Sequence, residues 1–284
     1  MIEILGLDCD QPIDPVEAIR KGYKFIFRYL SPNTLKHPRK QLTLAEADSY
    51  RDAGLEIGSI WETAPNRSLE GHGAGKIDAS LAIHQALVCK LPQDRPIFFC
   101  GQDEWYPAVD FPYISTYYVG INEILPTSQI GNYSGFYVMK LLFDQDLIKF
   151  GWQTPSWSKN AAGIIQWDPR AQIHQFRPKA QDTIKGITVD VNTAVQGNYG
   201  QWGYFKPLIQ RKGGTQMFIM VRSDGQATRV WANGFDVYDN VAQVRAWQRA
   251  NAAAGNNLIP TIHAGQEGFT DDDYARIIED LKTA

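Results

Sequence analysis

From the N-terminus to Asn192, short apolar runs alternate with longer stretches in which apolar residues recur at helical spacing. The apolar runs are too short for helices and predict buried strands; the clearest are 2–8, 24–30, 55–62, 95–100 and 128–134. The intervening stretches predict helices at 15–21, 43–54, 77–91, 111–125 and 136–147. Four further runs, KFGWQT, GIIQW, AQIHQF and GITVDVN, are strand-like and complete the series.

Alternation of strands and helices over this length predicts a parallel sheet with crossover helices. The strand count is close to eight, which favours a closed (β/α)8 TIM barrel in the α/β class. We expect an irregular barrel, because no long helical pattern separates the last strand-like runs. A doubly wound open sheet is the alternative, and the absence of a GxGxxG motif after a strand weakens it.

The pattern changes at the glycine-containing stretch 211–214. Beyond it, the runs 217–222, 226–232 and 235–238 predict strands, with a hairpin signal at Asn233-Gly234. Helical patterns follow at 241–253 and 274–282. We therefore expect a TIM barrel over residues 1–211 and a small C-terminal α+β module over residues 212–284.

Composition excludes several classes of protein. The net charge is −3 and no basic stripe is present, so no nucleic-acid partner is expected. The 3 cysteines form no CxxC motif, and neither a disulfide framework, a metal site nor a cofactor is predicted. No apolar segment reaches 18 residues, so no membrane insertion is predicted. Met1 leads directly into a strand without a signal-peptide pattern, so we expect synthesis in the cytoplasm.

Acidic residues recur at the predicted strand ends. In a TIM barrel the catalytic groups come from these ends. A strand-end acid can also cap a helix or pair with an arginine, as Glu62 could with Arg28 or Arg67. Glycoside hydrolysis uses one protonated and one ionised carboxyl group, while amides and aromatic rings hold the sugar. The candidate acids are Asp8, Asp10, Glu62, Asp103, Glu104 and Asp190. The candidate polar and aromatic ligands of a sugar are Gln102, Trp105, Tyr133, Gln153, Trp157, Gln175 and Asn192.

Two other hydrolase classes fit less well. A metal-dependent hydrolase could use Asp8 and Asp10 as ligands, but such sites usually recruit histidine, and only His174 falls near a predicted strand end. A serine hydrolase would need a GxSxG elbow, and the nearest match is Asn132-Tyr-Ser134-Gly.

The motifs GLDCDQP, GLEIGSIWE, PIFFCGQDEW, IGNYSGFYV, WQTPSWS, IHQF and GITVDVN resemble, in order and spacing, the glycoside-hydrolase-like barrel called domain of unknown function 1906. That group is related to glycoside hydrolase family 25, the Chalaropsis-type lysozymes. The resemblance covers about residues 1–205 and implies a glycosidase acting on peptidoglycan or another cell-wall polysaccharide.

In the lysozymes the fourth strand ends in Asp-x-Glu, and the resemblance implies that Glu104 is the general acid. Gln102 then replaces the Asp, while a register shifted by one would bring Asp103 into the site. Asp8 and Asp190 match further catalytic acids of these relatives. Tyr133 and Asn192 match strand-end residues, of which the Tyr helps to hold the substrate's reacting amide. The relatives use the substrate's N-acetyl group as nucleophile, and the neutral Gln102 stands where an acid would orient it.

The C-terminal module resembles tail segments of bacteriophage and prophage proteins. This resemblance implies a phage lysin released by a holin, or a virion component in contact with other virion subunits. In both cases the site of action is the bacterial cell wall and the partner is a wall glycan. The alternative is a catalytically inactive barrel that binds glycan in a phage tail, for which Gln102 and the supply of Trp and Tyr are the arguments.

Overall fold

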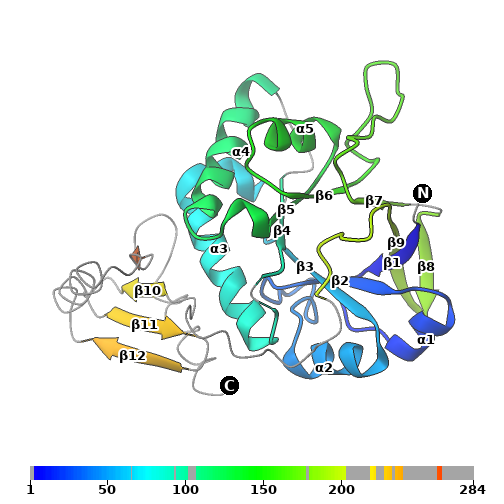
Figure 1. Ribbon diagram of the computed structural model, residues 1–284, viewed down its shortest axis with the longest axis horizontal. Coiled ribbons are helices and arrows are strands. Elements are labelled where there is room, and N and C mark those ends of the chain that lie inside the picture. Colours follow the sequence, from blue (N-terminus) through cyan, green and yellow to red (C-terminus); the bar gives the residue numbers. More distant parts are fainter. Residues whose placement is uncertain are drawn as a thin grey trace. The chain divides into compact units, whose positions relative to one another are not determined.

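The computed structural model describes residues 3–64, 66–92, 94–101, 107–176 and 179–202, together with four strands nearer the C-terminus. The chain divides into two compact units, Met1–Leu208 and Ile209–Ala284. Each unit is described by itself. The first contains a closed barrel with helices on its outside (Figure 1).

Eight strands close the barrel, which confirms the predicted α/β barrel. They follow each other around the ring in the order β1-β2-β3-β4-β5-β6-β7-β9, and β9 pairs back onto β1. A further strand, β8, pairs with the start of β9. The strands are β1 (Ile4–Asp8), β2 (Phe25–Tyr29), β3 (Glu56–Trp61), β4 (Ile97–Cys100), β5 (Ile130–Ser134), β6 (Phe150–Gln153), β7 (Ile173–Gln175), β8 (Gln181–Ile184) and β9 (Ile187–Ala194).

Five α-helices connect the first strands, as the periodicity predicts. Thr43 and Glu46 have capping-box spacing, and the Thr43 side chain accepts a hydrogen bond from the Glu46 N–H at 3.2 Å. Gly54 ends the same helix in the left-handed conformation. The helices are α1 (Pro15–Arg20), α2 (Leu44–Ala53), α3 (Gly71–Val88), α4 (Pro107–Asn122) and α5 (Phe136–Asp144). None of the helices in the described parts of the chain combines the length and apolar character needed to cross a bilayer.

The last strand of the barrel runs against its neighbours. β9 is antiparallel to both β1 and β7, whereas all pairs from β1 to β7 are parallel. Antiparallel strands need only a tight turn between them, so β8 and β9 are joined at Lys185-Gly186, both with positive φ. The missing helical pattern in this part of the sequence therefore reflects a reversed strand, and the reversal sets Asp190 directly opposite Asp8.

Aromatic rings fill the barrel interior. Phe27 packs edge-on against Phe98, with 5.0 Å between ring centroids, and in a tilted arrangement against Trp152, with 4.6 Å between ring centroids. Glycines on the intervening strands make room for these rings: a Cβ at Gly58 would lie 2.4 Å from the Phe27 ring, and one at Gly131 2.5 Å from the Phe98 ring. Because side chains alternate between the two faces of a strand, this layer fixes which strand-end residues point inward.

Two sequence predictions need correction in this unit. Helix α3 begins at Gly71 rather than at residue 77, so the glycine-rich stretch before 77 is helical. The run GIIQW is not a strand: it lies in the loop 154–172 between β6 and β7, with Ile164 largely exposed and a single bridge between Lys159 and Ile165. This run was predicted to be a strand because of its apolar content alone.

The early glycines of α3 allow it to pack closely on α4. A Cβ at Gly75 would lie 1.9 Å from the Tyr117 carbonyl oxygen, and a Cβ at Gly120 would lie 2.1 Å from the His72 carbonyl oxygen. Both obstacles are backbone atoms, which cannot move aside as a flexible side chain can. At these two positions the backbones of α3 and α4 are so close that only the hydrogen atom of a glycine fits between them.

Replacing Gly75 by Ala tests this packing. Ala is ordinarily better than Gly inside a helix by about 0.5–1 kcal/mol, but here the added methyl group must push the helices apart. We expect Gly75→Ala to destabilise the barrel by roughly 1–3 kcal/mol, measured by urea unfolding. A stability equal to or above that of the wild type would show that α3 and α4 are not in close contact.

The second unit contains the three predicted strands. β10 (Phe218–Val221), β11 (Ala227–Trp231) and β12 (Gly234–Tyr238) form an antiparallel meander, and the β11–β12 register pairs Trp231 with Gly234. A fourth strand, β13 (Thr261–His263), pairs parallel with β10 and was not predicted. The predicted helices 241–253 and 274–282 lie outside the described residues.

Candidate active site

A pocket of about 300 Å³ opens at the end of the barrel where the parallel strands finish. The reversed strand β9 contributes to the same end because its Asp190 pairs with the last residue of β1. Four of the predicted acids therefore line one pocket. The lining residues are Asp8, Cys9, Asp10, Tyr29, His37, Lys40, Glu62, Gln181, Thr188 and Asp190.

Asp8 forms the buried floor of the pocket, with only 5% of its surface exposed. Its Oδ2 atom accepts two hydrogen bonds, from Gln175 Nε2 at 3.0 Å and from Asn192 Nδ2 at 2.8 Å. Both donors are neutral amides, so Asp8 is hydrogen-bonded without a cationic partner in either contact. These two hydrogen bonds hold the Asp8 side chain in one orientation and do not neutralise its charge.

Each of these amides is oriented by a further hydrogen bond from an aromatic residue. The Tyr133 hydroxyl donates to Gln175 Oε1 at 2.7 Å, and Trp152 Nε1 donates to Asn192 Oδ1 at 2.7 Å. With each oxygen occupied by a donor, the NH2 group of each amide faces Asp8. The structure thus brings together the predicted residues Tyr133, Gln175 and Asn192 around Asp8.

The environment of Asp8 favours its protonated form. Burial, then the charge of Asp190, and to a smaller extent that of Glu62, raise the pKa of Asp8 to about 7, against the lowering effect of its two hydrogen bonds. Burial and the charge of Asp10 also raise the pKa of Asp190, which accepts a hydrogen bond from Gln181 Nε2 at 2.9 Å. The opposed pair therefore holds a proton close to neutral pH.

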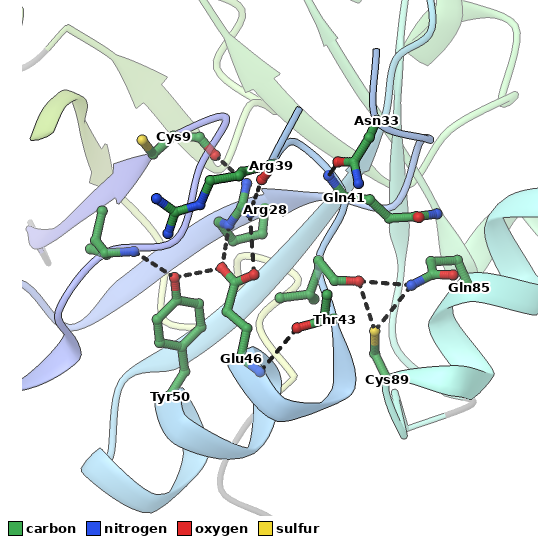
Figure 2. A network of polar contacts seen from close by, with 12 residues as sticks. Cys9, Arg28, Asn33, Arg39, Gln41, Thr43, Glu46, Tyr50, Gln85 and Cys89 are labelled. Atoms are coloured by element: carbon green, nitrogen blue, oxygen red, sulfur yellow. Dashed lines mark hydrogen bonds and ion pairs between the residues drawn. The ribbon is translucent and has the colours of Figure 1, made fainter. Parts of the chain in front are cut away.

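A buried ion pair supports the loop that carries Asp8 and Asp10. Arg28 is fully buried and donates to the Cys9 carbonyl at 2.6 Å, to the Arg39 carbonyl at 3.1 Å and to the Glu46 carboxylate at 2.6 Å (Figure 2). Tyr50 donates a further hydrogen bond to Glu46. The pairing of Glu62 with Arg28 that the sequence left open is wrong, because Arg28 pairs with Glu46 of α2.

Two basic residues on the segment between β2 and α2 contact the pocket acids or their backbone. His37 Nδ1 lies 2.6 Å from Asp10 Oδ2, and both side chains are about half exposed. Lys40 Nζ donates to the Glu62 carbonyl at 2.8 Å and sits 4.4 Å from the centroid of the Tyr29 ring. The sequence analysis missed both, because they stand on a loop and not at a strand end.

Four more lining residues were not among the predicted site residues: Cys9, Tyr29, Gln181 and Thr188. Tyr29 could have been found from strand alternation, since Phe25 and Phe27 of the same strand point into the barrel. Gln181 and Thr188 belong to the β8–β9 hairpin, whose first strand is short, polar and mostly exposed. It carries no apolar pattern that would have revealed it.

Strand alternation also explains where Gln153 and Trp157 lie. Trp152 points into the barrel, so its neighbour Gln153 points out. Gln153 is fully buried and bonds to Ser158 Oγ and to the backbone of the 154–168 loop. The structure thus gives it a bracing role in place of the predicted contact with substrate. Trp157 is half-buried and packs edge-on against Tyr133, with 5.8 Å between ring centroids.

Four predicted residues, Gln102, Asp103, Glu104 and Trp105, lie outside the described residues. Their roles stay predictions. The described chain before them ends at Gly101, whose carbonyl accepts a hydrogen bond from Ser68 Oγ at 3.0 Å. Within the described residues, no group of three or more His, Cys, Asp or Glu side chains is arranged to hold a metal ion.

The raised pKa of Asp8 makes a prediction about stability. Between about pH 4 and pH 7 the unfolded chain has released this proton while the folded chain keeps it, so the wild type loses stability as the pH rises through this window. The shift corresponds to at most about 4 kcal/mol. Asp8→Asn removes the ionisation and should therefore lose less stability than the wild type between pH 5 and pH 8 in urea unfolding.

Asp146→Asn is the matched control for this comparison, because Asp146 is exposed and borders a separate pocket that lies before β6. It should keep the wild-type dependence of stability on pH. Identical pH profiles for Asp8→Asn, Asp146→Asn and the wild type would contradict the raised pKa of Asp8.

A family model described as "Rv2525c-like, glycoside hydrolase-like domain" matches residues 17–194. The match spans more than half of the chain, and the chain therefore belongs to this family. This confirms the resemblance of the barrel, while a phage or prophage origin stays a prediction. A comparison with curated proteins found no match.

Among solved structures, the Tat-secreted protein Rv2525c of Mycobacterium tuberculosis in complex with L-tartrate matches with a TM-score of 0.63 and 21% identity, over 70% of this chain and 98% of that one. An uncharacterized protein of B. stearothermophilus matches with a TM-score of 0.49 and 17% identity, over 67% and 95% of the two chains. The Clostridium perfringens spore cortex lytic enzyme SleM matches with a TM-score of 0.48 and 14% identity, over 84% and 77%. At these identities the likeness to Rv2525c shows the fold alone.

Proposed function

We propose that this member of the Rv2525c-like, glycoside hydrolase-like family hydrolyses a glycosidic bond in a bacterial cell-wall polysaccharide, with peptidoglycan as the first candidate. The observation that carries the proposal is the opposed pair Asp8 and Asp190 in a pocket at the end of the barrel. Two opposed carboxyl groups whose pKa values are both raised can share one proton and keep one negative charge at neutral pH, and glycoside hydrolysis uses a carboxylate of this kind beside a separate general acid.

The roles divide between the described pair and the predicted acid. Glu104, by its resemblance to the lysozyme acid, protonates the oxygen of the leaving sugar. Negative charge shared by Asp8 and Asp190 stabilises the positive charge that develops on the sugar ring in an oxocarbenium-like transition state. Gln102 is neutral where the lysozymes have an acid, so this charge has to come from the opposed pair.

The surroundings of the pair suit a sugar. Tyr29 supplies an aromatic surface and Gln181 an amide at the pocket edge. Gln175 and Asn192 both donate hydrogen bonds to Oδ2 of Asp8, and neither of these contacts uses Oδ1. The site thus combines a fixed carboxyl group, polar groups that can bond to hydroxyls, and a ring for stacking.

The proposal places the protein at the bacterial cell wall, released by a holin or carried on a phage particle. The C-terminal module supports this location only through its resemblance to phage tail segments. On this view, the module attaches the barrel to the wall or to other virion subunits, while the barrel acts on the glycan.

Release of soluble reducing sugar from purified Gram-positive cell walls tests the proposal. We expect Glu104→Gln to lower the rate by about 10²–10⁴-fold, the usual contribution of a general acid. Asp190→Asn should also lower it, because it removes one of the two carboxyl groups that share the negative charge. Asp146→Asn should leave it unchanged. Unfolding midpoints of all variants establish that the loss is chemical.

The opposite result has a defined meaning. If the wild type releases no sugar yet sediments with the walls, the protein is a glycan-binding barrel without activity. If Glu104→Gln retains full activity, the assignment of the acid by resemblance is wrong.

A further inference from the structure

The segment Asn33–Lys40, which we call the rim loop, gathers positive charge at the edge of the acidic pocket. It follows β2 and contains Lys36, His37, Arg39 and Lys40 but no acidic residue. Residues 33–39 are exposed, and His37 and Lys40 line the pocket. A basic segment therefore borders a pocket in which the other charged residues that the structure describes are Asp and Glu.

The rim loop has a fixed shape. Thr34 and His37 exchange two backbone hydrogen bonds of 3.1 Å, and Asn33 Oδ1 accepts from the Gln41 N–H at 2.8 Å. Arg28 donates to the Arg39 carbonyl from below (Figure 2). The same guanidinium holds the Cys9 carbonyl between Asp8 and Asp10. One buried side chain thus positions both the rim loop and the pocket acids. A ligand that contacts both therefore binds a surface that is already ordered, and little conformational entropy is lost on binding.

The four basic residues differ in the contacts that they make. His37 contacts Asp10, and Lys40 donates to the Glu62 carbonyl and lies over Tyr29. Lys36 and Arg39, by contrast, form no ion pair with any other described residue, and both are exposed. Two uncompensated positive charges therefore stand beside the pocket and not inside it.

This arrangement determines which ligands fit. The carboxylates of the pocket would repel a sugar ring that itself carries negative charge, and they accept neutral rings with hydroxyl groups. Lys36 and Arg39 attract an oxyanion located next to such a ring, and Arg can bind a phosphate or carboxylate with two parallel hydrogen bonds. The complementary ligand is a neutral sugar with an anionic substituent nearby.

We propose that the rim loop binds a phosphate or carboxylate group attached to the glycan whose neutral ring enters the pocket. This inference rests on the proposed function, since it names the substrate class of the same site as an anionic cell-wall glycan. Lys36 and Arg39 supply the charge. Binding at the rim selects anionic wall polymers over neutral oligomers and sets the direction in which the chain lies across the pocket.

Binding measurements with the double variant Lys36→Gln/Arg39→Gln test the proposal. The variant keeps the Arg39 backbone carbonyl on which Arg28 depends, so its unfolding midpoint should equal that of the wild type. The matched control is Lys24→Gln/Lys149→Gln, which removes two exposed lysines immediately before β2 and β6, at the opposite ends of those strands. Both pairs are placed in the Glu104→Gln background so that cleavage does not alter the ligand.

Three probes are compared: purified Gram-positive walls, the same walls stripped of phosphodiester-linked polymers, and a neutral N-acetylglucosamine oligomer. We expect the rim-loop variant to bind intact walls about tenfold more weakly at low ionic strength, with the difference shrinking to about twofold in high salt. The control variant should bind like its parent, and neither variant should change binding of the neutral oligomer.

The outcomes separate the two sources of negative charge. A loss confined to intact walls identifies the phosphate of the attached polymers, and an equal loss on stripped walls identifies a carboxylate of the glycan itself. No loss, an equal loss in the control variant, or no binding of walls by the parent overturns the proposal. Because binding is measured without cleavage, wild-type protein that binds walls but releases no sugar would overturn the hydrolase function and leave the rim loop's role standing.

Discussion

Asp8 and Asp190 face each other across the seam where β9 closes the barrel onto β1, and most of the site depends on this opposition. Backbone hydrogen bonds between the two strands hold the two residues in register, so the carboxyl groups cannot move apart by a simple rotation of the chain. Aromatic packing below them keeps water away from Asp8. Repulsion and burial together keep a proton on the pair near neutral pH.

Holding like charges together costs free energy, and the surrounding structure offsets it. The interior layer of Phe, Trp and Gly packs the barrel just beneath the pair. On the outside, the buried Arg28–Glu46 ion pair fixes the residues that follow β1. A buried ion pair contributes little net stability in itself, and here its consequence is positional: it holds Cys9, and with it the two neighbouring acids. Like charges held together at one end of a well-packed scaffold are an arrangement typical of functional sites.

The sequence predicted the barrel and the gathering of acids because both follow from simple periodicities. Apolar runs marked all eight barrel strands, and parallel strands bring their ends to one face. The reversed direction of β9 showed in the pattern only as a missing helix, and Asp190 still reached the pocket because its partner in the ladder is Asp8. Gln153 was placed in the site because strand ends were considered without asking which face each residue occupies.

Other features depend on contacts that no local pattern reports. His37 and Lys40 come from a loop without periodicity, and only the folded chain brings them to Asp10 and Glu62. The glycines at the start of α3 precede the predicted helix 77–91, and in the fold they allow close helix packing. Glu46 has the position of a capping-box residue, but its carboxylate is used by Arg28. Each of these is a tertiary interaction that replaces a local preference.

Direct titration of the Asp8 carboxyl carbon by NMR tests the central claim, with the resonance assigned by comparison with Asp8→Asn. The account predicts a midpoint near pH 7 in the wild type and a clearly lower midpoint in Asp190→Asn, where the opposing charge is gone. A midpoint close to pH 4 in the wild type, or one that Asp190→Asn leaves unchanged, would contradict the claim that Asp8 and Asp190 act as a coupled pair.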